Sequence, residues 1–261
     1  MSTRSGRSCR QRREPGKPQR GEQLVLFKPR GGKRRGAGRP PKGAWAGSPH
    51  KPRPELAARY PVHVVLRVVA AIGSLRRRRA YRAIQRATLT AARRDDFRIV
   101  HISIQRTHVH LLVEARDARA LAAGMQGFQI SAARHLNAAI SVGRAEPRRG
   151  AVFPDRYHAE IIRSPRQARH ALVYVVSNWR KHGEDRHPKT RDWKVDWFSS
   201  AAMFPAFTEQ IDEPFLWRGP PSYEPLQVRR PRTWLLRDGW KRHGATISCH
   251  DVPSAASAPP G

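Results

Sequence analysis

The sequence predicts an α+β fold: a ferredoxin-like antiparallel sheet with helices packed on one face, preceded by a disordered basic arm. Two observations carry this prediction. Apolar and polar residues alternate over residues 61–69, and β-branched and apolar residues dominate residues 97–104 and 109–113, which favours three strands. Around these runs, apolar residues recur at helical spacing, so the expected order is strand, helix, hairpin, helix, strand, helix.

The chain divides by composition into three parts. Residues 1–54 are rich in Lys, Arg, Gly and Pro and lack aliphatic periodicity, so we expect them to be a disordered arm. Within it, Gly38-Arg39-Pro40 resembles an AT-hook, in which Arg39 would enter the DNA minor groove; a solvated basic linker is the alternative. Residues 55–205 are the expected folded domain, and residues 206–261 are a basic extension rich in Pro and Trp.

The charge of the chain indicates a polyanionic partner. The sequence has 51 Lys and Arg against 20 Asp and Glu, a formal net charge of +31, which favours nucleic acid over an acidic membrane surface. No apolar run approaches the length of a membrane span, and residues 1–20 lack the apolar centre of a signal peptide. With Cys9 and Cys249 far apart in the sequence, we expect a reduced cytoplasmic protein associated with the bacterial nucleoid.

The first strand is followed by a helix with a strongly basic face. Gly73 and Ser74 are expected to end the strand and cap this helix, which would run to about Arg94. Its basic face is predicted to contact DNA phosphates, with a solvated helix face as the alternative. The candidates on this face are Arg76, Arg77 and Arg78.

The hairpin holds the first candidate site. His108 and His110 point to the same face because side chains alternate along a strand. At roughly 3.3 Å per residue they lie about 7 Å apart along the backbone, so both imidazoles can lean onto one divalent cation. A chance His-x-His pair without a ligand is the alternative. In the turn before them, Arg106 and Thr107 are predicted phosphate contacts.

The second candidate site lies on the last predicted helix. Asp117 should cap the helix before it, and residues 156–163 should form a strand between the two. The last helix begins at Ser164-Pro165-Arg166-Gln167, which combines a serine cap, a proline at the first helical position and a glutamine that closes a capping box.

Tyr174 and Asn178 are one turn apart on this helix, which makes a phenol and an amide neighbours. A tyrosine that serves only packing is the alternative. Lys181, near the end of the helix, is a predicted DNA contact.

These two motifs together resemble the single-tyrosine transposases of the HUH superfamily, particularly their REP-associated subgroup. The resemblance covers residues 60–204. Its motifs are Pro61-Val62-His63-Val64-Val65-Leu66-Arg67-Val68, Thr107-His108-Val109-His110-Leu111-Leu112-Val113-Glu114, Asp155-Arg156-Tyr157-His158-Ala159 and Tyr174-Val175-Val176-Ser177-Asn178-Trp179-Arg180-Lys181-His182-Gly183.

The resemblance implies an enzyme, a tyrosine transposase or HUH endonuclease, that cuts and rejoins hairpin-forming single-stranded DNA. It implies that Tyr174 is the nucleophile, forming a 5′-phosphotyrosine, and that His108, His110 and Asn178 hold Mg²⁺ or Mn²⁺. Many relatives have Gln or His in place of Asn178, which leaves the third ligand open. Action of Tyr174 within one subunit or across a homodimer is also open.

Several alternatives accompany this interpretation. The first is a non-catalytic basic DNA- or RNA-binding protein descended from a transposase. Tyr157 is a second tyrosine near the motifs, but strand alternation separates it from His158. Glu114 could orient a ligand imidazole or be solvated. In the C-terminal extension, residues 233–244 should form a short basic helix that docks on the domain or stacks on an unpaired base.

Overall fold

The computed structural model describes residues 54–212, 219–220 and 223–253. Residues 1–53 of the predicted arm, with Arg39 and the AT-hook-like segment, lie outside the described residues.

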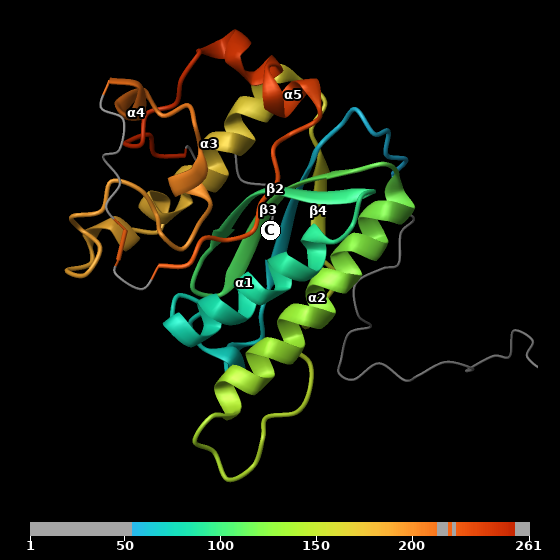
Figure 1. Cartoon of the computed structure of the whole chain (residues 1–261), viewed down its shortest axis with the longest axis vertical. Helices are drawn as coiled ribbons and strands as arrows, with labels where there is room; N and C mark the ends of the chain where they lie inside the picture. The colour runs from blue at the N-terminus through green and yellow to red at the C-terminus, as the bar shows by residue number, and fades with distance from the viewer. Residues whose placement is uncertain (1–53, 213–218, 221–222, 254–261) are drawn as a thin grey trace, which may run out of the picture. The chain divides into compact units, whose positions relative to one another are not determined.

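The centre of the described fold is a four-stranded antiparallel sheet (Figure 1). Its strands are β1 (Val62–Arg67), β2 (Phe97–Ile104), β3 (His108–Ala115) and β4 (His158–Ile161), in the order β2-β3-β1-β4. In the register of β1 and β3, Val64 lies opposite Leu111 and Leu66 opposite Val109, so the apolar residues of both strands share one face. The predicted α+β class and antiparallel sheet are therefore confirmed.

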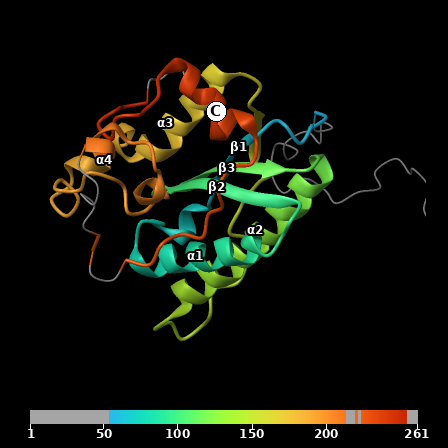
Figure 2. The same ribbon diagram turned by 45° about the horizontal axis from the view of Figure 1, so that its top comes forward.

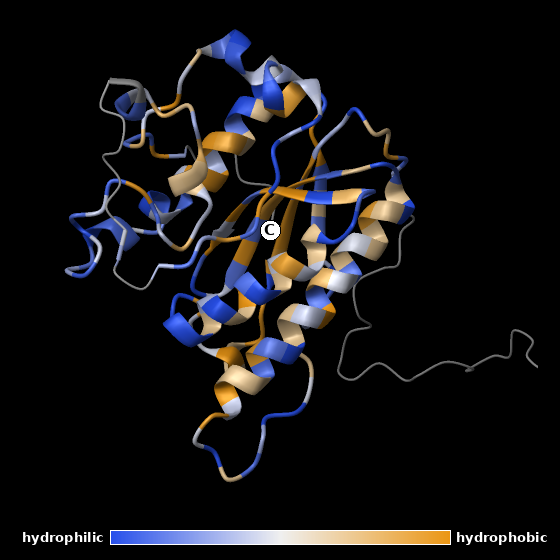
Figure 3. Ribbon diagram, viewed as in Figure 1, coloured by the Kyte–Doolittle hydropathy of each residue, from blue (hydrophilic) through white to orange (hydrophobic). Residues whose placement is uncertain are grey.

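Two helices cover the apolar face of the sheet. Figure 2 shows α1 (Arg78–Ala92) and α2 (Ala118–Ser141) side by side beneath the strands, and Figure 3 shows the apolar stripes along them. Asp117 caps α2 as predicted, since its carboxylate accepts a hydrogen bond from the Ala120 N–H at 2.7 Å. The first helix begins later than predicted. Leu75 is buried and its N–H bonds to the Arg106 carbonyl at 2.8 Å, which keeps residues 73–77 outside the helix.

The opposite face carries α3 (Pro165–Lys181), so helices lie on both faces of the sheet and not on one alone (Figure 2). The predicted capping box is present: the Ser164 hydroxyl accepts from the Gln167 N–H, and the Gln167 side chain accepts from the Ser164 N–H. Leu172 and Val176 of α3 pack in one hydrophobic cluster with Leu112 of the sheet. This packing places α3 on the same face of the sheet as the predicted histidine pair.

Described residues beyond position 205 also belong to the hydrophobic cluster that contains α3 and Leu112. They include α4 (Thr208–Asp212), α5 (Trp234–Arg237) and a 3₁₀ turn over residues 239–243. Leu236 and Trp240 join the cluster that holds α3, so the predicted docking of this extension is confirmed. Leu226 belongs to the other hydrophobic cluster, beneath the sheet, where α1 and α2 pack against the strands. Residues of the extension therefore contribute to both hydrophobic clusters.

Glu114 ties the extension to the sheet. The residue is 4 % exposed, and its carboxylate accepts hydrogen bonds from the backbone N–H groups of Arg232 and Thr233, at 2.9 and 2.8 Å, and from the Thr233 hydroxyl at 2.8 Å. Arg98 approaches the same carboxylate at 3.6 Å. Both expectations for Glu114, a solvated side chain or a partner of a ligand imidazole, give way to this structural role.

None of the helices that the structure describes is both long and apolar enough to cross a membrane.

Candidate active site

The histidine pair lies on the sheet face that α3 covers. His108 opens β3 and His110 follows two residues later, and their ring centroids are 4.7 Å apart with the planes nearly perpendicular. His63 of the neighbouring strand β1 faces the same side, with its ring centroid 5.3 Å from that of His110. Three imidazoles from two paired strands thus form one cluster.

Tyr174 reaches this cluster from α3. Its ring centroid is 5.0 Å from that of His110 and 5.6 Å from that of His63, edge to face in both cases. The tyrosine is buried, but it belongs to neither hydrophobic cluster. Lys181 Nζ lies 4.9 Å from the centre of the tyrosine ring, so a positive charge accompanies the phenol. The predicted phenol and the predicted imidazoles therefore meet within one chain.

The δ nitrogen of each predicted histidine ligand lies within hydrogen-bond distance of a neighbouring side chain. His110 Nδ1 is 3.2 Å from His63 Nε2, and His108 Nδ1 is 3.2 Å from the Thr107 hydroxyl. Within the described part of the chain, His110 Nε2 is buried without a hydrogen-bond partner, and so are both amide atoms of Asn178. Unpaired buried polar atoms are rare in folded proteins, and a bound cation would satisfy two of these three atoms, the imidazole nitrogen of His110 and the amide oxygen of Asn178. The residues present therefore fit a divalent cation.

The protonation of the cluster suits cation binding. Burial, with smaller effects of neighbouring cationic groups, lowers the pKa of His63 and His108 to about 4, and the pKa of His110 well below its usual range. All three imidazoles are therefore neutral near pH 7 and offer lone pairs. Burial raises the pKa of Tyr174, so its hydroxyl keeps its proton at neutral pH until a nearby positive charge stabilises the phenolate.

Two histidines at the site, His63 of the cluster and His182 beside it, were not among the predicted site residues. His63 lies on the same face of β1 as Arg67, and only the pairing of β1 with β3 brings it to His110. His182 follows α3 directly, and its ring centroid is 5.4 Å from that of His108. A signal for His63 was present in the alternation of residues 61–69, since it is a polar residue, like Arg67, on the face away from the apolar core.

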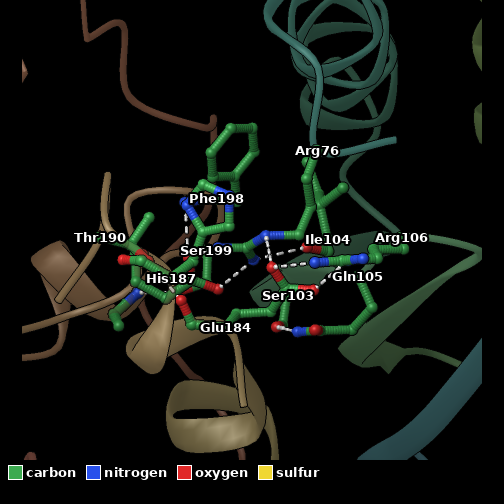
Figure 4. Close-up of polar contacts among 12 residues, drawn as sticks. Arg76, Ser103, Ile104, Gln105, Arg106, Glu184, His187, Thr190, Phe198 and Ser199 are labelled. Carbon is green, nitrogen blue, oxygen red and sulfur yellow. Dashed lines mark hydrogen bonds and ion pairs between the residues drawn. The ribbon is translucent and has the colours of Figure 1, made fainter. Parts of the chain in front are cut away.

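Among the predicted DNA contacts, Arg76 has a different role. Its guanidinium bonds to both oxygens of Asp196, at 2.8 and 2.9 Å, and lies 3.6 Å from Glu184, with the Arg76 side chain 6 % exposed. Figure 4 shows Arg76, Arg106 and Glu184 gathered where the hairpin meets the segment after α3. Arg76 is therefore a buried structural partner and not a surface for phosphate.

The other basic candidates are more accessible. Arg77 and Arg78 are exposed at the start of α1. The Arg106 side chain is 63 % exposed while its Nε lies 2.5 Å from Glu184, so it can reach solvent from the edge of the site. Thr107 is exposed and bonds to His108 in the way described above.

A second group of potential ligand atoms lies elsewhere. Atoms of Glu209, Cys249 and His250 are within 4.8 Å of one another. Both carboxylate oxygens of Glu209 are already occupied, by the Ser248 hydroxyl at 2.5 Å and the Cys249 N–H at 2.9 Å. We assign this group to the attachment of α4 to residues 248–250.

Comparisons with known proteins give one family match and a similarity to a solved structure. The family model described as "Transposase IS200 like" matches residues 58–178, a segment that contains His63, His108, His110, Tyr174 and Asn178. A search of curated proteins gives no match to this chain. Among solved structures, the chain is similar to a REP-associated tyrosine transposase bound to a REP hairpin, with 15% sequence identity, a TM-score of 0.42, and coverage of 71% of this chain and 100% of that one. Over residues 58–178, the chain is therefore similar to the IS200-like transposases.

Proposed function

We propose that this protein is a transposase that cuts and rejoins hairpin-forming single-stranded DNA, with Tyr174 as the nucleophile. The observation that carries the proposal is the 5.0 Å separation between the ring centroids of Tyr174 and His110, two residues 64 positions apart whose types suit the two halves of one reaction. A phenol supplies a nucleophile, and neutral imidazoles supply ligands for a cation.

The cation we propose is Mg²⁺ or Mn²⁺. When bound, it would draw negative charge from a non-bridging phosphate oxygen and hold the phosphate in line with the nucleophile. His108 and His110 would hold it through their ε nitrogens, since the δ nitrogens are bonded to Thr107 and His63. Asn178, one turn after Tyr174, would add its buried amide oxygen, which has no partner among the described residues.

The proposed step transfers a phosphoryl group from the 3′ oxygen of the DNA to the tyrosine. The Tyr174 hydroxyl oxygen bonds to phosphorus, the bond from phosphorus to the 3′ oxygen breaks, and the phenolic proton leaves while the 3′ oxygen gains one. Lys181, 4.9 Å from the ring, favours the developing phenolate by its charge. Because the phosphodiester becomes a phosphotyrosine, a 3′-hydroxyl of another strand can reverse the step without a nucleotide cofactor.

The remaining basic residues would hold the DNA backbone. Arg77 and Arg78 are exposed on one side, and Arg106 and Thr107 stand beside the histidines. We propose that these residues contact phosphates, which would make binding strongly dependent on salt. Since Tyr174 and both histidines come from one chain, we propose that each subunit cuts with its own tyrosine, whether or not the protein forms dimers.

The experiment that tests the proposal is capture of the covalent intermediate. An oligonucleotide hairpin with a single-stranded flank, labelled at its 3′ end, should become attached to the full-length protein in Mn²⁺ and shift on a denaturing gel. A 5′ label should be released on a shorter fragment. Tyr174→Phe should abolish the shift and keep DNA binding, while Tyr157→Phe, a tyrosine of the cluster beneath the sheet, should keep both.

One observation favours the alternative of a DNA- or RNA-binding protein without catalysis. Tyr174 is 6 % exposed, so a strand must displace neighbouring groups to reach its hydroxyl. If the unaltered protein binds hairpins tightly but gives no adduct with Mg²⁺ or Mn²⁺ on several hairpin sequences, this alternative replaces the proposed reaction. If His108→Ala and His110→Ala cut as well as the unaltered protein, the assignment of the cation site fails.

A further inference from the structure

We infer that His63 is a positioning residue, which holds His110 in the one tautomer that can bind the cation. The inference rests on the proposed function and adds a residue outside the predicted ligand set. Its basis is the hydrogen bond between His63 Nε2 and His110 Nδ1, 3.2 Å long and buried in the sheet face.

The bond has two possible assignments. A neutral imidazole carries one N–H, so one ring donates and the other accepts. If His63 donated, the proton of His110 would sit on Nε2, which is buried and has no acceptor among the described residues. If His110 donates through Nδ1, its Nε2 presents a lone pair instead. The second assignment avoids a buried unpaired N–H and leaves a nitrogen that can ligate a cation.

The surroundings of His63 make it a rigid partner. It lies on β1, a strand paired on both sides, opposite Leu112 of β3 and Glu160 of β4. The residue is 4 % exposed, and its ring is tilted by 21° from the plane of the His110 ring. The Tyr174 ring packs at a steep angle against both of these rings, at interplanar angles of 65° to His63 and 78° to His110. Movement of His63 would therefore disturb the ligand and the nucleophile together.

The contrast with His108 shows what His63 adds. The δ nitrogen of His108 is bonded to the hydroxyl of Thr107, which is exposed and can rotate to donate or accept. The partner of His110 is a buried ring with a fixed orientation. We expect the tautomer of His110 to be more uniform than that of His108.

The test begins with the tautomer in the metal-free, full-length protein. Protein with ¹⁵N-labelled histidine gives two-bond ¹H–¹⁵N correlations that distinguish Nδ1–H from Nε2–H. His110 should carry its proton on Nδ1. In His63→Phe, which keeps an aromatic ring against Tyr174 but removes the acceptor, His110 should become a mixture of tautomers.

The second measurement is the affinity for Mn²⁺, by calorimetry or by the Mn²⁺ electron resonance signal. His63→Phe should bind Mn²⁺ about 10–100-fold more weakly, the usual effect of losing a group that orients a metal ligand. His63→Gln offers an amide oxygen as acceptor and should recover most of the affinity. His101→Gln is the matched control: His101 is another buried strand histidine, bonded to the Ser200 hydroxyl at 3.1 Å, and its loss should leave the affinity unchanged.

The outcomes separate this inference from the proposed function. If the unaltered protein cuts DNA and binds Mn²⁺, but His110 carries its proton on Nε2 or His63→Phe binds Mn²⁺ equally well, the inference alone is overturned. If the unaltered protein neither binds Mn²⁺ nor forms an adduct, the proposed function is refuted, and the inference, which rests on it, is refuted too. If His63→Phe does not fold, two other results test the inference. A proton on Nε2 of His110 in the unaltered protein, or a large loss of Mn²⁺ affinity in His63→Gln, would overturn it.

Discussion

Replacement of Arg76 by glutamine should destabilise the fold without weakening the electrostatic part of DNA binding. The Arg76 and Asp196 side chains are 6 % and 1 % exposed and share two hydrogen bonds, of 2.9 and 2.8 Å. Arg76→Gln leaves the Asp196 carboxylate buried without its cation. Breaking a buried ion pair by removing one partner costs about 3–5 kcal/mol in free energy of unfolding.

That loss should lower the melting temperature by about 6–20 °C for a domain of this size. The assay is urea unfolding of the unaltered protein and the variant, followed by circular dichroism. Arg78→Gln is the matched control, since Arg78 is an exposed arginine two positions away. Its stability should change by less than about 0.5 kcal/mol, as is usual for surface substitutions.

DNA binding should show the opposite pattern. If Arg78 contacts a phosphate of single-stranded DNA, Arg78→Gln reduces the slope of log affinity against log salt by about 0.7. Arg76→Gln should leave that slope unchanged. A variant at Arg76 with unaltered stability and a smaller salt slope would refute the structural role. The double variant with Asp196→Asn should regain part of the lost stability, because it removes the unpaired carboxylate.

Three further outcomes follow from the site and its supports. Mixing a Tyr174→Phe protein with a His110→Ala protein should give no adduct if each subunit uses its own tyrosine, whereas restored cutting would demonstrate exchange between subunits. Glu114→Gln should lower the free energy of unfolding by about 2–4 kcal/mol in urea titrations, because a buried charged acceptor of several hydrogen bonds is lost; Glu160→Gln, on an exposed strand position, should not. The free energy of unfolding should fall as the pH drops from about 6.5 to about 4, because the unfolded chain then binds more protons than the folded one. Urea unfolding at a series of pH values measures this change. A free energy of unfolding that does not vary over this range would contradict the prediction. The groups responsible have a pKa of about 4 in the fold: His63, His101 and His108.

Local signals in the sequence predicted the elements that position the site. Ser164, Pro165 and Gln167 predicted the start of α3 because a capping box involves residues only three positions apart. The alternation around His108 and His110 predicted a shared face for the same reason: strand geometry acts over neighbouring residues. Tyr174 and His110 could be related to each other only through the family resemblance, since no local rule joins a helix to a strand.

The parts that escaped prediction depend on partners far away in the chain. Arg76 looked like a basic helix face until Asp196, 120 positions later, was brought beside it. The start of α1 moved because the Leu75 N–H is taken by the hairpin turn. His63 joined the site through strand register, which is set by the whole sheet. Long-range pairing of this kind leaves no periodic trace in the sequence.

The packing of Leu236 and Trp240 against α3 bears on how the protein is made. During synthesis on the ribosome, α3 emerges well before these residues, so its apolar side stays uncovered until they have been made. A message cut short near residue 205 would encode both histidines and the tyrosine yet lack the residues that cover the apolar side of the tyrosine's helix. We therefore expect truncated products to be less stable than the full chain.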